Sequence, residues 1–174
     1  MAGILSRFKD IMSSNINALL DKVEDPNKMI DQYLRNLESD LGKVKAETAA
    51  VMAEETRAKR ELNECNESID KMQNYAQKAL LAGNEADARI FLEKKEELNT
   101  KLTSLQQTYD IARENATKMR EMHDKLVKDI ASLNAKRDEL KAKMAIAQTQ
   151  EKLNKLGSSV NGAMGNMSKF DEME

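Results

Sequence analysis

Cys65 and His123 are the residues of this sequence whose types could support nucleophilic or metal chemistry. Each is the one residue of its type in the chain, and such a pair does not supply the ligands that a zinc site needs. The sequence has no glycine-rich phosphate loop and no HExxH, CxxC or GxSxG motif. Both residues also fall on a heptad pattern, where a partly buried structural role is expected. The sequence therefore predicts no catalytic, cofactor-binding or metal site, and no enzyme.

The composition favours long helices over a compact globule. Of 174 residues, 33% are charged and 3% are aromatic, with one proline and no tryptophan. Such a composition is typical of coiled coils and other long helices. The formal net charge of -2 provides no basic field for nucleic acid, so no nucleic-acid partner is expected.

The expected location is the cytoplasm, with the N-terminus retained. No apolar run approaches the roughly 18 residues that span a bilayer. The first residues are a poor signal peptide, because Arg7, Lys9 and Asp10 interrupt any apolar stretch. A single cysteine also fits a reducing compartment.

Two heptad seams organise most of the chain. From Ile30 to Ala79, steps of four and three residues meet thirteen apolar positions out of fifteen, with Thr48 and Glu55 as the exceptions. Such a sustained repeat predicts coiled-coil packing. Pro26, which follows the good N-cap residue Asp25, is expected to start this helix.

The second seam runs from Leu98 to Ala147 and again has thirteen apolar positions out of fifteen, with His123 and Arg137 as the exceptions. Between the seams, Gly83 and Asn84 signal a turn, because both residue types tolerate a left-handed backbone. Two heptad helices joined by a short turn predict an antiparallel hairpin. Glu55 and Arg137, the charged residues of the seams, are expected to reach water or to pair across the two helices.

Two apolar surfaces of the hairpin lack an expected partner. The second arm is longer than the first, so roughly its last 15 residues overhang the hairpin. Apolar side chains on an unpartnered helix favour contact with another copy of the chain. The candidate self-assembly residues are Met144, Ile146, Leu153 and Leu156 on the overhang, and Leu80, Leu81, Phe91 and Leu92 beside the turn.

The first 22 residues form an amphipathic pattern when they are projected on one helix. Most of the large apolar residues occupy an arc of about 140°, and the polar residue Asn15 lies inside it as an imperfection of the pattern. Arg7 and Lys9 lie at the edges of the arc, where their charges could reach anionic headgroups. The candidate membrane-binding residues are Ile4, Leu5, Arg7, Phe8, Lys9, Ile11, Met12, Ile16 and Leu19.

Periodicity does not decide what covers this apolar face. It could insert into a membrane, or it could fold back on the hairpin or on a neighbouring subunit. As a membrane anchor it would contribute about 5–8 kcal/mol before the cost of ordering the helix. One copy would therefore bind weakly and reversibly, and an assembly that presents many copies would bind through avidity.

The chain resembles the family of phage shock protein A and the vesicle-inducing protein in plastids. The resemblance rests on the run RFKDIMSSNINALLDKVEDPNKMIDQYLRNLESDLGKVKAETAAVMAEE, on ALLAGNEADAR at the turn, on MHDKLVKDI and on the terminal FDEME. It covers essentially the whole chain. The NINALLDK segment followed by EDP, one helix before a long heptad hairpin, is its most specific part.

The resemblance implies a membrane-remodelling protein related to the ESCRT-III superfamily. Members assemble into rings, rods or tubes on the inner face of the cytoplasmic membrane or on thylakoids, and maintain the membrane under stress. The family's membrane-inserting helix corresponds to residues 2–22. A later helix that joins neighbouring subunits begins at Phe170, although Glu172 stands where relatives often carry a basic residue. Some members also inhibit an AAA+ transcriptional activator, which makes such a regulator a candidate for a further partner, although no residue of this sequence points to it.

The predicted fold is all-α, with six segments. They are an amphipathic membrane-binding helix at 1–24, the first hairpin arm at 25–81, the tip at 82–87, the second arm at 88–156, a flexible linker at 157–169 and the start of a C-terminal helix at 170–174. The predicted function is a homo-oligomer that binds and remodels anionic membranes as a peripheral protein. One alternative is a cytosolic coiled-coil adaptor with its N-terminal helix packed away. The other is a nucleotide hydrolase that powers its own assembly, which the missing phosphate loop disfavours.

Overall fold

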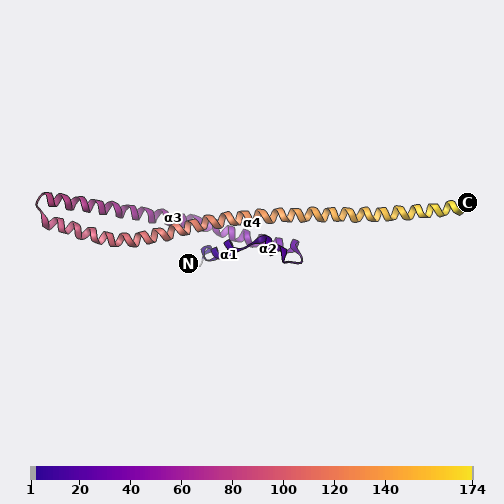
Figure 1. Cartoon of the computed structure of the whole chain (residues 1–174), viewed down its shortest axis with the longest axis horizontal. Helices are drawn as coiled ribbons and strands as arrows, with labels where there is room; N and C mark the ends of the chain where they lie inside the picture. The colour runs from indigo at the N-terminus through magenta and orange to yellow at the C-terminus, as the bar shows by residue number, and fades with distance from the viewer. Residues whose placement is uncertain (1–2, 174) are drawn as a thin grey trace. The chain divides into compact units, whose positions relative to one another are not determined.

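The computed structural model describes the backbone of residues 3–173 and the side chains of residues 3–157. Within that range the chain contains helices and no strands, which confirms the predicted all-α class. Figure 1 follows α3 through the turn into α4, the two long helices of the chain. In chain order the elements are the 3-10 helix η1 (Ile4–Arg7), α1 (Phe8–Ser13), α2 (Ile16–Asp21), α3 (Pro26–Leu81) and α4 (Glu85–Met173).

The chain forms two compact units, and both long helices contribute to each. The first unit comprises Met1–Ser14 and Asn36–Lys128, and the second comprises Asn15–Arg35 and Asp129–Glu174. The hairpin tip and residues 3–14 therefore belong to the same unit.

In the first unit, α3 and α4 pack against each other along the two predicted seams. The Lys95 ammonium donates a hydrogen bond of 2.6 Å to Gln73, and the Arg120 guanidinium lies 3.8 Å from the carboxylate of Glu55. The seam position Glu55 thus pairs across the helices, as the sequence predicted. The seam side chains Ala58, Leu62, Cys65, Ala76, Ala112, Ala116, Met119 and Leu126 are buried.

In the second unit, the start of α3 lies beside α4. Asp25 accepts a hydrogen bond of 3.4 Å from the amide of Lys28, so it caps α3 as expected. The guanidinium of Arg137 lies 3.8 Å from Asp31, and its Nη2 donates to Asn134 at 3.0 Å. Arg137, the other charged interruption of the seams, is therefore also paired with a neighbouring helix.

The turn between α3 and α4 uses Gly83 and Asn84 in different ways. The amides of Gly83 and Asn84 donate to the carbonyls of Leu80 and Ala79, at 3.0 and 2.8 Å, which closes the end of α3 in a Schellman arrangement. Gly83 has φ +79°, whereas no non-glycine residue of the described chain has positive φ. Asn84 instead caps α4, because its side-chain oxygen accepts from the amide of Asp87 at 3.2 Å.

Alanine at Gly83 and at Gly42 is expected to change stability in opposite directions. Gly83→Ala should lower the free energy of unfolding by about 1–2 kcal/mol, because a Cβ disfavours the left-handed backbone. No atom crowds a Cβ at either position, so the backbone alone decides the sign. Gly42→Ala, inside α3, should raise the free energy by about 0.5–1 kcal/mol. Urea unfolding followed by circular dichroism measures both, and effects of the same sign would contradict this account.

The structure differs from the predicted segments at the C-terminal side. Gly157, two serines and further small residues predicted a flexible linker at 157–169. α4 instead continues as one helix through these residues to Met173. A helix can continue through residues of weak helix propensity, because its backbone hydrogen bonds do not require an apolar stripe. The boundary that the small residues predicted was therefore misplaced. The side chain of Phe170 lies outside the described residues.

Candidate membrane-binding segment and its docking face

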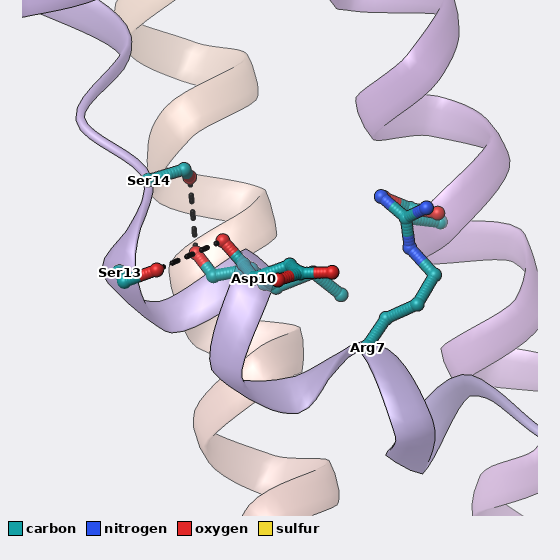
Figure 2. A network of polar contacts seen from close by, with 6 residues as sticks. Arg7, Asp10, Ser13 and Ser14 are labelled. Atoms are coloured by element: carbon teal, nitrogen blue, oxygen red, sulfur yellow. Dashed lines mark hydrogen bonds and ion pairs between the residues drawn. The ribbon is translucent and has the colours of Figure 1, made fainter.

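The predicted single N-terminal helix is broken in the structure. η1 and α1 run from Ile4 to Ser13, and α2 begins at Ile16. The hydroxyl groups of Ser13 and Ser14 donate to the carbonyls of Asp10 and Ile11, at 3.5 and 3.0 Å, and Ser14 is extended with ψ 138° (Figure 2). Serine side chains that bond the backbone in this way compete with continuing the helix.

Asn15 has a structural role at this break. Its side-chain oxygen accepts a hydrogen bond of 3.1 Å from the amide of Ala18, so it is the N-cap of α2. Asn15, which interrupts the apolar arc of the projection, is therefore a helix start. The N-terminal segment, as we call residues 3–14, is consequently a separate piece from α2.

The N-terminal segment contacts α3 through two carboxylates. The guanidinium of Arg7 lies 3.1 Å from the carboxylate of Asp40, and in Figure 2 its side chain extends away from its own helix. The amide of Ile4 donates a hydrogen bond of 2.9 Å to Glu47. Asp40 and Glu47 are seven residues apart and therefore share one face of α3.

The same segment contacts α4 through two lysines. The ammonium of Lys118 lies 5.2 Å above the centre of the Phe8 ring, within the range of a cation–π interaction. The ammonium of Lys125 donates a hydrogen bond of 2.9 Å to the carbonyl of Ser14. Met122 lies between these lysines on the same helical face and is fully buried, although it is not on the seam.

We call this surface the docking face: Asp40 and Glu47 of α3, with Lys118, Met122 and Lys125 of α4. Sequence reasoning missed all five residues, because it examined only the apolar seams. Met122 carried a signal, since it is a large apolar residue three positions after Met119 and outside the heptad repeat. Its position indicates a second buried stripe on α4.

Docking divides the predicted membrane-binding residues into three groups. Ile4 and Ile11 are 2% and 4% exposed, so their side chains already lie in an apolar environment. Burial of each stabilises this arrangement by about 1.5–3 kcal/mol relative to water. Ile16 is also buried, Leu5, Phe8 and Met12 are half-buried, and Arg7, Lys9 and Leu19 are exposed. In the N-terminal segment the hairpin thus covers the apolar face, which is one of the alternatives that periodicity left open.

The Arg7–Asp40 pair is electrostatically asymmetric. The Asp40 side chain is 9% exposed, whereas the Arg7 side chain is 50% exposed. Removing the cation would leave a carboxylate buried without its ionic partner, which costs more than losing an exposed ion pair. The docked Arg7 thus compensates the buried charge of Asp40. Arg7 itself is exposed enough to exchange Asp40 for another anion.

The apolar residues predicted for self-assembly are mostly exposed. At the hairpin tip, Leu80, Leu81 and Leu92 are exposed, while Phe91 is half-buried with its ring 5.4 Å from that of Tyr75. On α4, Met144, Ile146, Leu153 and Leu156 are exposed. The thioether of Met144 accepts a hydrogen bond from Asn27 near the start of α3. All side chains from 141 to 157 are exposed. The contact with Asn27 places Met144 beside the start of α3, so this residue does not belong to the overhang as predicted.

Cys65 and His123, the residues whose types could support chemistry, both have structural partners. The thiol of Cys65 is buried and donates to the carbonyl of Leu98 at 3.5 Å, and His123 lies 3.3 Å from Asp124. A hydrogen bond from Lys143, together with the charge of Lys136, lowers the pKa of Glu139 below its usual value. The described residues contain no group of three or more candidate metal ligands and no helix able to cross a membrane.

Comparisons with known proteins agree with this architecture. The family model for PspA/IM30 matches residues 3–174. The phage shock protein A homolog of Bacillus subtilis is 63% identical over 171 residues, covering 98% of this chain and 75% of that protein. The membrane-associated protein Vipp1 of Nostoc punctiforme is 31% identical and covers 99% of this chain, which spans 66% of Vipp1. Protein LiaH of Bacillus subtilis is 28% identical over 87% of this chain and 67% of LiaH. The chain belongs to the PspA/IM30 family.

Proposed function

We propose that this chain is a non-enzymatic, self-assembling protein that binds anionic membranes peripherally and remodels them under envelope stress. The observation that carries the proposal is the amphipathic N-terminal segment with Arg7 and Lys9 at its edges. Membership of the family supports a membrane-associated role in stress response or remodelling, and related proteins such as Vipp1 are named as membrane-associated. The proposed location is the inner face of the cytoplasmic membrane.

The mechanism that we propose begins with assembly. Hairpins stack side by side, and the exposed apolar residues of the tip and of the overhang contact neighbouring copies. Many N-terminal segments then face one bilayer, so that weak single contacts add up through avidity. Their apolar side chains enter one leaflet to a shallow depth, while Arg7 and Lys9 remain with the headgroups.

A cytosolic adaptor remains the second candidate, because one observation favours it. Ile4 and Ile11 are buried on the hairpin, as expected for a protein whose N-terminal residues stay packed away. Such an adaptor would use its hairpin to bind a protein regulator, and it would not need lipid. Vesicle binding therefore separates the two functions.

Flotation with anionic vesicles tests the membrane role. The full chain is expected to float, whereas Phe8→Asp or a chain without residues 1–24 should remain at the bottom of the gradient. A charge at Phe8 cannot enter the apolar layer without a large cost. Ser6→Asp adds the same charge at an exposed position and serves as the matched control. Equal flotation of Phe8→Asp and Ser6→Asp would contradict the role assigned to the segment.

A further inference from the structure

The N-terminal segment cannot be docked and inserted at the same time. Ile4 and Ile11 are buried within the first unit, and insertion would require the same two side chains to enter a lipid layer. Moving an apolar side chain between two water-free environments changes its free energy little, because the gain comes from leaving water. The apolar residues therefore do not decide strongly between the two states, and the polar contacts do.

The polar contacts of the docked state are ones for which an anionic lipid surface can compete. Arg7 is half-exposed while it pairs with Asp40, so a lipid phosphate can approach it before the segment leaves. Phosphate offers an arginine the same charge-assisted, bidentate geometry as a carboxylate. The hydrogen bond from the Ile4 amide to Glu47 holds the other end of the segment.

We propose that the docking face is an electrostatic latch that keeps the N-terminal segment closed until an anionic membrane surface takes Arg7 from Asp40. This inference rests on the proposed membrane function and adds its regulation. In the closed state, Asp40 and Glu47 hold the segment from α3, and Lys118 and Lys125 hold it from α4. Away from the membrane, the latch keeps two isoleucines covered. At the membrane, the latch weakens the apparent affinity for lipid, because only the fraction of chains that are open can bind.

Neutralising the two carboxylates is expected to open the latch. The double variant Asp40→Asn, Glu47→Gln retains the size of both side chains but loses the charge that strengthens each contact. It should reach half-maximal binding to anionic vesicles at about 3–10-fold lower lipid concentration than the unmodified chain. The matched control is Glu38→Gln, Glu67→Gln, which removes the same charge from exposed positions of α3. Comparison with this control separates the opening of the latch from the stronger attraction of any more positive chain to anionic lipid.

Hydrogen exchange without lipid measures the latch independently. The peptide that contains residues 3–14 should exchange faster in the Asp40→Asn, Glu47→Gln variant than in the control, because the Ile4 amide loses its charged acceptor. Inorganic phosphate should not open the unmodified chain, since it offers no apolar layer for the released isoleucines.

Each outcome decides between the two proposals. Faster exchange together with tighter vesicle binding than the control supports the latch. Unchanged exchange, or faster exchange with the same lipid dependence as the control, overturns it, even where the unmodified chain floats and the membrane role stands. If neither the unmodified chain nor the open variant binds vesicles, the membrane role and the latch both fail.

Discussion

Replacing Leu126 with alanine is expected to lower the free energy of unfolding by about 2–5 kcal/mol. Leu126 is 0% exposed and lies near Met119 and Met122, which are also fully buried. α4 has α3 on one side here, and its Lys125 holds the N-terminal segment on another. A cavity at a fully buried position collapses only in part, which adds a cavity cost to the loss of apolar burial.

The neighbouring Val127 provides the matched control for this experiment. It is 44% exposed, so Val127→Ala removes apolar atoms without opening a cavity and should change the free energy by less than about 0.5 kcal/mol. Urea unfolding should be compared at one protein concentration, because assembly makes stability depend on concentration. Equal destabilisation by the two variants would contradict the packing described here.

Replacing Leu153 and Leu156 together with glutamine is expected to abolish the large assemblies that we propose. The two side chains are 60% and 62% exposed on the part of α4 beyond the start of α3. Burying each against a neighbouring copy would contribute about 1.5–3 kcal/mol. Because every subunit of a polymer repeats the contact, loss of both leucines should shift the population to small species. Light scattering and negative-stain microscopy measure this change.

The control for assembly keeps the same helix and changes polar residues. Lys152→Gln and Lys155→Gln lie in the same turns, and glutamine preserves helix propensity. Circular dichroism should show equal helix content in both double variants. Rings or rods that persist unchanged in the leucine variant would exclude this surface as an assembly contact.

The heptad repeats predicted the hairpin correctly because coiled-coil packing depends on a local repeat. Steps of three and four residues place one stripe of side chains on a helix, and the buried seam residues confirm this stripe. The turn was also readable, since Gly83 provides the left-handed residue that closes α3. Asn84 also lies in the turn as predicted, but its left-handed tolerance is not used, and its capping of α4 depends on which amide its side chain reaches.

The N-terminal residues show the limit of local patterns. A projection on one ideal helix cannot reveal a break, so it treated Asn15 as a defect when this residue starts α2. Asp40 looked like any other acid on a solvated face of α3. Its burial became visible only when Arg7, more than thirty residues away along the chain, was placed against it.

By itself, the sequence determined the helical class, the two seams, the turn and the existence of an amphipathic N-terminal segment. Each of these follows from residue spacing within one helix, which the chain carries locally. Only the tertiary structure decided that the apolar face of the segment is covered by its own hairpin, and that Asp40 and Glu47 hold it there. The physical reason is that an apolar face gains free energy from leaving water whichever surface covers it, so its partner is selected by polar contacts between residues distant in sequence.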